Sequence, residues 1–231
     1  MKKRIMFIFL FVFLFICLGI VGIKINELLN IPNVKKEEIE QFEILNIKED
    51  TDKYILNVYY PTTKYEILNE TISLEVNEYI NSFRDELVKL SNDKKYSLEI
   101  TFETYSTNDT ISFLFNVSEN LGCLHGEKYV FSINYNVKKN KIINISDLIL
   151  ENESLLEKLQ NKCYDALIQN DDIKNAGVEE FVKEGTKPEI KNYDTFILND
   201  KSITIYFGEY QVVPYYLGIQ KVEVLLSELY N

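Results

Sequence analysis

Histidine and tryptophan are almost absent from this sequence. Its 231 residues include one histidine and no tryptophan. A single histidine excludes the zinc motifs that take two or more histidines from one chain. A glycosidase acts through two carboxylates and usually also needs a tryptophan platform for sugar, so carboxylate-pair chemistry is disfavoured although its residue types are present.

Glycine is also scarce, and its spacing excludes several enzyme classes. The eight glycines form no G-x-G-x-x-G, no Walker loop and no G-x-S-x-G. Cys123 and His125 lie two residues apart, which is no metal-ligand set without further partners. We therefore expect a protein that is not an enzyme and holds no metal or other cofactor. Two interpretations of His125 are open: it is a turn histidine whose ring is hydrogen-bonded to nearby backbone, or it is a residue of a binding site.

Basic residues are outnumbered by acidic ones. The chain has 25 Lys and Arg against 36 Asp and Glu, a formal net charge of −11. Three of these cations are Lys2, Lys3 and Arg4, so the rest of the chain has 22 cations, 36 acidic residues and a formal charge of −14. Such a chain repels nucleic acid and anionic lipid and attracts a cationic partner. The alternative is that acidity only keeps an exported domain soluble.

One uncharged run, "IMFIFLFVFLFICLGIVGI", occupies residues 5–23. As a helix it would be about 28 Å long, close to the hydrocarbon thickness of a bilayer. The cations before it place residues 1–4 in the cytoplasm and the remainder outside. We favour a single-pass cell-membrane anchor, and a signal cleaved after Gly22 and a lipoprotein signal at Cys17 are the alternatives.

The rest of the chain alternates between strand and helix patterns. Period-two alternation and 3.6-residue periodicity predict strands over 53–61, 96–106, 111–119 and 128–137, helices over 69–91, 153–170 and 176–185, and closing strands within 193–224. We predict the α+β class, a mostly antiparallel sheet packed against two or three helices after the transmembrane helix. The expected divisions are a cytoplasmic stub at 1–4, an anchor or signal at 5–23, a stalk and first strand at 24–50, and the two parts of an extracellular module at 51–120 and 121–231.

Two cysteines follow the apolar run, Cys123 and Cys163. Outside the cytoplasm an even count permits a disulfide between them. Two buried free thiols are the alternative. The abundance of Lys, Asn and Ile suggests an AT-rich Gram-positive genome, in which exported disulfides are less dependable.

Three stretches carry a resemblance to a known family. They are "VYYPTTKYEILNETISLEVNEYINSF", "GCLHGEKYVFSINYNVKKNKIINISDLI" and "FILNDKSITIYFGEYQVVPYYLGIQKVEV". In this order they resemble the two-part extracellular module of the anti-sigma-V factor, a lysozyme receptor (RsiV-like), a domain of unknown function that also precedes the catalytic domain of certain peptidoglycan deacetylases. Within the histidine motif, Cys123 and Leu124 stand where Gly and Ala are usual.

The resemblance implies an extracellular receptor for a cationic, lysozyme-like protein. Only "MKKR" precedes the apolar run, and the sequence ends at Asn231. We therefore expect neither sequestration of a sigma factor nor a fused deacetylase domain.

The segment after the strand-like run at 203–207 is the candidate binding surface. Gly208 lets the chain bend, Pro214 fixes a turn, and Gly218 takes a positive φ. The candidate binding residues are Glu127, His125, Glu209, Tyr210, Tyr215 and Tyr216. The tyrosines form either a plug for the end of the sheet or a rigid aromatic patch that docks a cationic protein or a glycan.

Three functions compete. The first is a membrane-anchored, non-enzymatic binding module of a Gram-positive cell envelope that recognises a cationic protein such as lysozyme. The second is an accessory protein that binds peptidoglycan and assists a separate cell-wall enzyme. The third is a catalytic module acting on glycan through carboxylates, for which the sequence supplies no identifiable acid–base pair.

Overall fold

The computed structural model describes residues 42–91, 93–122 and 125–230. The predicted stub at 1–4, the apolar run at 5–23 and most of the stalk lie outside the described residues. Within the described ranges, no helix is long and apolar enough to cross a membrane. The structure therefore addresses the predicted module and leaves the anchor a prediction.

A six-stranded sheet, sheet A, contains the first strands in the spatial order β1-β2-β3-β4-β5-β6. The strands are β1 (Glu43–Asp50), β2 (Tyr54–Thr62), β3 (Tyr96–Ser106), β4 (Thr110–Asn120), β5 (Glu127–Asn136) and β6 (Lys141–Ile143). All neighbours pair antiparallel except β2 and β3, which run parallel with Val58 opposite Ile100. The predicted α+β class with a mostly antiparallel sheet is confirmed.

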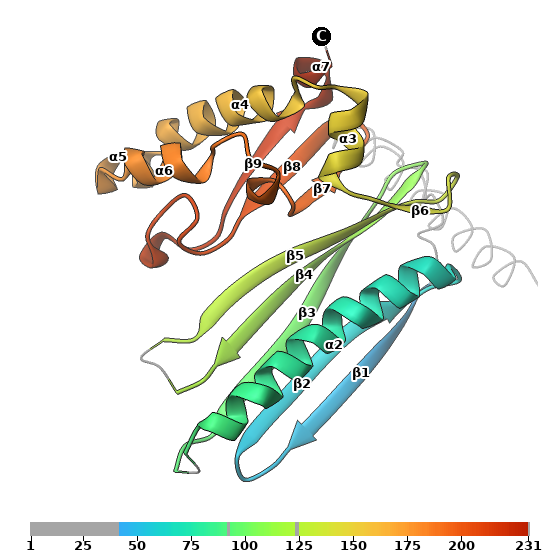
Figure 1. The fold of residues 1–231 in the computed structure, drawn as a ribbon, viewed down its shortest axis with the longest axis vertical. Coiled ribbons are helices and arrows are strands. Elements are labelled where there is room, and N and C mark those ends of the chain that lie inside the picture. Colours follow the sequence, from blue (N-terminus) through green and yellow to red (C-terminus); the bar gives the residue numbers. More distant parts are fainter. Residues whose placement is uncertain (1–41, 92, 123–124, 231) are drawn as a thin grey trace, which may run out of the picture. The chain divides into compact units, whose positions relative to one another are not determined.

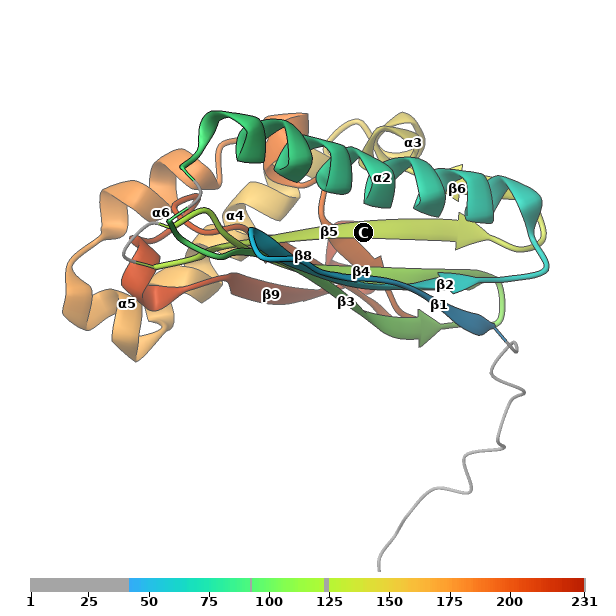
Figure 2. The same cartoon turned by 90° about the horizontal axis from the view of Figure 1, so that it is seen from below.

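Helix α2 (Glu66–Lys89) forms the crossover that a parallel pair requires. It lies along one face of sheet A (Figures 1 and 2). Its apolar residues recur every three or four positions and make one buried stripe: Leu68, Ile72, Val76, Ile80, Phe83 and Leu87. This stripe packs on the apolar residues of the sheet in a core that also includes Leu98, Ile100, Phe113 and Phe115.

The start of α2 corrects the sequence prediction, which began this helix at residue 69. The helix begins at Glu66, one turn earlier. The Asn69 side chain instead reaches back, with Oδ1 accepting from the Thr63 amide at 2.7 Å and Nδ2 donating to the Thr63 carbonyl at 2.7 Å. Asn69 therefore fixes the loop between β2 and α2 rather than the first turn of the helix.

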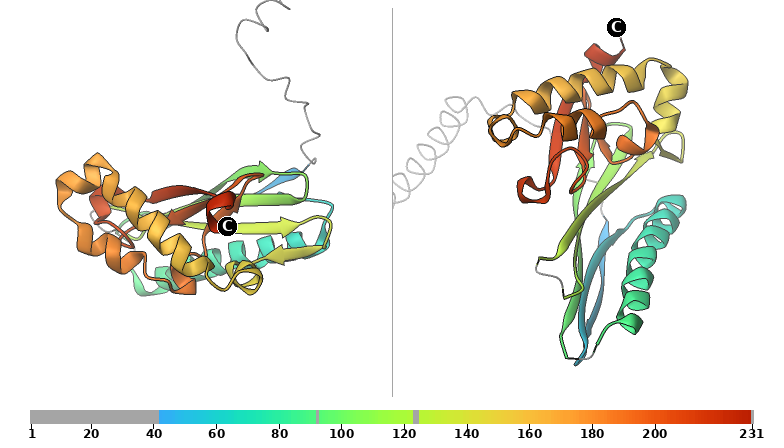
Figure 3. Two further views of the ribbon diagram at one scale, coloured as in Figure 1. Left: turned by 90° about the horizontal axis from the view of Figure 1, so that it is seen from above. Right: turned by 60° about the vertical axis from the view of Figure 1, so that its left-hand side comes forward.

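A three-stranded antiparallel sheet, sheet B, follows with the order β7-β8-β9. Its strands are β7 (Phe196–Leu198), β8 (Ser202–Phe207) and β9 (Gln220–Leu225). The helices of this part are α3 (Ile145–Glu151), α4 (Leu155–Gln169), α5 (Asp171–Ala176), α6 (Glu179–Gly185) and α7 (Leu226–Leu229), with short 3-10 turns η1 (Ile190–Asn192) and η2 (Tyr215–Leu217). Figure 3 shows α4 lying along sheet B.

The second core lies between these helices and sheet B. It includes Leu155, Leu159, Cys163, Leu167, Ile203, Ile205, Phe207, Val222 and Val224. Along the sequence, the boundary between the two cores lies near Ile143. Strands β5 and β6 come before this boundary because they complete sheet A.

Strand β7 joins the two sheets through buried and half-buried polar side chains. The Phe196 amide donates to Ser132 Oγ at 2.9 Å, and Asn134 Nδ2 donates to the Phe196 carbonyl at 2.8 Å. The Ser112 hydroxyl in turn donates to Asn134 Oδ1 at 2.6 Å. Because an unpaired buried amide is costly, these bonds fix how β7 sits on β5.

Candidate binding site

The loop between β8 and β9, residues 208–219, carries three of the predicted tyrosines. Val212 and Val213 in its centre are fully buried in the second core. Gln211 anchors the loop: its Oε1 accepts from the Gly208 amide at 3.1 Å, and its Nε2 donates to the carbonyls of Asn192 at 3.0 Å and Gly185 at 3.4 Å. The loop is therefore held from inside while its tyrosines remain at the surface.

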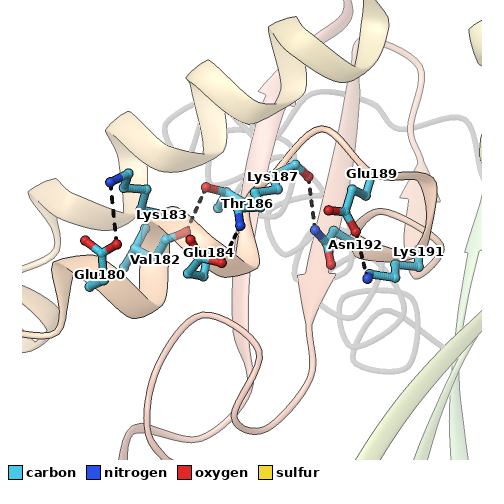
Figure 4. A network of polar contacts seen from close by, with 9 residues as sticks. All are labelled: Glu180, Val182, Lys183, Glu184, Thr186, Lys187, Glu189, Lys191 and Asn192. Atoms are coloured by element: carbon cyan, nitrogen blue, oxygen red, sulfur yellow. Dashed lines mark hydrogen bonds and ion pairs between the residues drawn. The ribbon is translucent and has the colours of Figure 1, made fainter.

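The segment that receives Gln211 is itself braced by polar contacts (Figure 4). The Thr186 hydroxyl donates to the Val182 carbonyl at 2.7 Å, and Asn192 Nδ2 donates to the Lys187 carbonyl at 3.0 Å. Behind it, the Tyr193 hydroxyl donates to the Thr186 carbonyl at 2.6 Å. This support extends from α6 through η1 to the base of the loop.

Backbone geometry in the loop confirms the prediction for Gly218 and adds a left-handed position that the sequence did not indicate. Gly218 has φ 67°, the positive value that was predicted. Gly208 does not have a positive φ, and the left-handed position belongs to Tyr210 at φ 64°. For a bulky residue this conformation is strained, and such strain is often found at functional sites.

The turn between β4 and β5 meets this loop. The ring of His125 stacks on that of Tyr215, with centroids 3.8 Å apart and an interplanar angle of 21°. The Tyr215 hydroxyl donates to the Gly126 carbonyl at 3.5 Å, and Glu209 Oε2 accepts from the Lys128 amide at 3.0 Å. Residues about 90 positions apart in the sequence thus form one surface.

Two further tyrosines extend this surface. The Tyr210 ring lies 5.9 Å from that of Tyr215 and is 55% exposed. Tyr216, which lies in the same 3-10 turn as Tyr215, is 68% exposed. The aromatic patch of Tyr210, Tyr215 and Tyr216 is therefore open to a partner, while Tyr215 is also half-buried as the plug interpretation requires.

Carboxylates flank the patch on the β4–β5 side. Glu127 accepts a hydrogen bond from the Tyr129 hydroxyl, and burial together with this bond raises the pKa of Tyr129. Burial, followed by the charges of Glu127 and Glu86, raises the pKa of Glu119. The carboxylates of this flank are therefore poorly solvated in their charged form. A cation placed beside them would be stabilised by their negative charge.

The structure brings together His125, Glu209, Tyr210 and Tyr215 and places Glu127 and Tyr216 beside them. Sequence reasoning missed Tyr129 and Glu119. Tyr129 stands two residues after Glu127 on one strand, so the period-two alternation of a strand could have placed both on one face.

Cys163 is a free thiol on α4 and is fully buried in the second core. Burial raises its pKa to about 12. Cys123 lies outside the described residues, so the disulfide between the two stays a prediction.

The groups that this site presents are aromatic rings and carboxylates. Within 42–91, 93–122 and 125–230, no group of three His, Cys, Asp or Glu side chains could hold a metal ion. The aromatic faces, the buried loop anchor and the carboxylate flank instead suit the recognition of a cationic surface.

Comparison with known proteins finds a family model that resembles part of the chain. Residues 146–227 match the model of a protein family of unknown function, DUF3298. The peptidoglycan-N-acetylmuramic acid deacetylase PdaC of Bacillus subtilis (strain 168) is 25% identical over 238 residues, covering 99% of this chain and 50% of that protein. Esterase Rv3036c of Mycobacterium tuberculosis (strain ATCC 25618 / H37Rv) is 20% identical over 200 residues, covering 83% of each. The chain thus spans about half the length of the deacetylase that it matches.

Two crystal structures share the fold. A DUF3298 family protein from Pseudomonas aeruginosa PAO1 has a TM-score of 0.60 at 12% identity, covering 82% of this chain and 93% of that one. A DUF3298 family member from Bacteroides fragilis NCTC 9343 has a TM-score of 0.55 at 16% identity, covering 83% and 92%. The predicted link to a domain of unknown function that also occurs in a peptidoglycan deacetylase is confirmed at the level of this DUF3298 domain.

Proposed function

We propose that this chain is a membrane-anchored, extracytoplasmic binding module of a Gram-positive cell envelope that recognises a cationic protein such as lysozyme. Residues 5–23 serve as its single-pass anchor, and the module from 24 onward faces the cell wall. Its binding residues are His125, Glu127, Glu209, Tyr210, Tyr215 and Tyr216. It recognises its partner without catalysis.

One observation carries the proposal, the stack of His125 on Tyr215. This contact joins the β4–β5 turn to the β8–β9 loop and sets exposed tyrosines beside carboxylates. Tyrosine gives large contact area with few rotatable bonds, and it attracts lysine and arginine through its ring face. A lysozyme-like surface, rich in both cations, complements this arrangement.

A second candidate, binding of peptidoglycan as an accessory protein, is supported by a different observation. The relative that this chain matches along nearly its whole length is a peptidoglycan deacetylase, and the match leaves half of that protein uncovered. Under this alternative the module would hold glycan for a separate enzyme, with the tyrosines stacking on sugar rings.

Calorimetric titration separates these candidates. The full chain in non-ionic detergent is titrated with a C-type lysozyme, and separately with neutral peptidoglycan oligosaccharides, at low and at physiological salt. We expect saturable one-to-one lysozyme binding that survives physiological salt. Saturable oligosaccharide binding without lysozyme binding would replace the first candidate by the second, and binding of neither would contradict both.

Variants assign the surface. Tyr215→Ala should weaken lysozyme binding at least tenfold, because it removes the ring on which His125 stacks. Tyr230→Ala is the matched control, a tyrosine that is 47% exposed and follows α7, past the end of β9 that is remote from the loop. Glu209→Gln should weaken binding less, because the amide oxygen can still accept from the Lys128 amide. Glu157→Gln, at an exposed position of helix α4, is its charge-matched control.

A further inference from the structure

A cleft of about 510 Å³ opens at the place where the two cores meet. Its walls come from α2, from β5 and β6, from the start of α3 and from the segment just before β7. The volume is within the range of small-molecule sites. None of the candidate binding residues described above lines it.

Two carboxylates on different elements line this cleft, Glu75 on α2 and Asp194 before β7. Burial raises the pKa of Glu75, and the charge of Glu78 raises it further. Asp194 lies at the mouth, where it is exposed, yet the partial withdrawal of its carboxyl group from water also raises its pKa. The negative charges are therefore poorly solvated and would gain from a cation.

No lysine or arginine of the described residues offsets these charges. Among them, the nearby Lys141 is bound to Asp147, with Nζ and Oδ1 2.9 Å apart. Several neutral polar groups of the cleft are also engaged, since Ser132 and Asn134 hold β7. Glu75 and Asp194 are thus the two groups whose charge lacks compensation in the cleft.

The remaining lining mixes polar and apolar side chains, and its apolar part is rigid. Phe131 stacks on Phe115 with centroids 4.5 Å apart and on Tyr79 at 5.2 Å, so its ring is fixed. Ile142 on β6 adds an aliphatic surface. Two carboxylates make too small a ligand set for a metal ion, whereas they suit an organic cation whose carbon chain can pack on such walls.

We propose that this cleft binds an organic cation, an alkylammonium or guanidinium group, through Glu75 and Asp194. The cation arrives either on a free small molecule or as the lysine or arginine side chain of a docked protein. The inference concerns different residues from those proposed above; its small-molecule form can be tested alone, and its side-chain form rests on the function proposed above.

The test is carried out on the full chain in non-ionic detergent at physiological salt. The probe is argininamide. Citrullinamide is the matched neutral ligand, since it replaces the guanidinium by a urea group of the same shape. Calorimetry should show saturable argininamide binding and at least tenfold weaker citrullinamide binding. The double variant Glu75→Gln/Asp194→Asn should lose at least tenfold in affinity, whereas Glu70→Gln, an exposed acidic residue on the same helix, should bind like the unmodified protein.

The variants also report on folding. Neutralising poorly solvated carboxylates removes an unfavourable charge, so the double variant should unfold at the same temperature as the parent or a higher one. A second outcome is that argininamide does not bind, while the double variant weakens lysozyme binding tenfold and Glu70→Gln leaves it unchanged. In that case the cation is a side chain of the partner. Equal binding of both amides, or a double variant with unchanged affinity for argininamide and for lysozyme alike, would overturn the proposal.

Discussion

At the scale of single residues, Tyr210 is the position where stability and binding are expected to oppose each other. Its φ of 64° costs a residue with a Cβ roughly 1 kcal/mol, which glycine avoids. Tyr210→Gly should therefore leave the free energy of unfolding unchanged or raise it by up to about 1 kcal/mol, while lysozyme affinity falls several-fold. Urea denaturation and calorimetry on one sample check both, and a variant with full affinity would show that this ring takes no part in docking.

At position 185 a glycine is required because there is no space for a side chain. A Cβ placed there would lie 2.0 Å from the carbonyl oxygen of Gln211, a backbone atom of the anchored loop. Gly185→Ala should lower the free energy of unfolding by about 3 kcal/mol, the upper end of the usual cost of overpacking. Gly208→Ala is the control, because a Cβ there meets nothing within 4 Å. Equal loss in the two variants, measured by urea denaturation, would contradict this reason.

At the scale of elements, α2 supports sheet A through its buried stripe. Phe83 is fully buried, and its ring packs edge-on to Tyr54 with centroids 6.0 Å apart. Phe83→Ala should lower the free energy of unfolding by about 3–5 kcal/mol, the usual cost of truncating a buried phenylalanine. Val88→Ala, on the same helix at 84% exposure, should change it by less than about 0.5 kcal/mol. Chemical denaturation monitored by circular dichroism gives both values.

Helix α4 buries its cysteine, and this gives a chemical prediction. Because the folded pKa of Cys163 is about 12, the thiol stays protonated and should resist iodoacetamide at pH 8 until the protein unfolds. The unfolded thiol ionises near pH 8.5, so its contribution to stability is complete below about pH 8.5 and is lost as pH rises towards 12. Mass spectrometry after alkylation in native and in denaturing buffer checks this. A Cys163 that needs a reductant before it is alkylated in denaturant would instead establish a disulfide.

The sequence predicted the helices and strands better than it predicted which of them pair or pack with one another. The predicted helix over 69–91 contains five of the six residues of the buried stripe on α2 and leaves out Leu68, because it begins one turn too late. On α4 the apolar periodicity does not indicate that Cys163 is fully buried, since a small residue signals burial weakly. The parallel pairing of β2 with β3 had no local signal at all, because it depends on how α2 packs across the sheet.

At the scale of the whole molecule, the candidate site depends on contacts between residues far apart in the chain. Nothing local to His125 or to Tyr215 indicates that they stack, and their grouping came from motifs recognised in order rather than from spacing. The cleft at Glu75 and Asp194 had no sequence signal, because it exists only where the second core meets sheet A. Pairing between distant segments is decided by packing, which a single sequence does not display.

The overall charge of the chain predicts how association with a cationic partner responds to salt. A net charge of −11 should attract such a partner over distances of the order of the screening length, about 10 Å at 0.1 M salt and about 3 Å at 1 M. The association rate constant with lysozyme should therefore fall steeply between these salt concentrations. The dissociation rate constant should change little, because the stacked and hydrogen-bonded contacts of the patch are short-ranged. Stopped-flow mixing at several salt concentrations measures both constants. A dissociation rate that rises as steeply as the association rate falls would mean that the partner is held by general charge attraction and not by the aromatic patch.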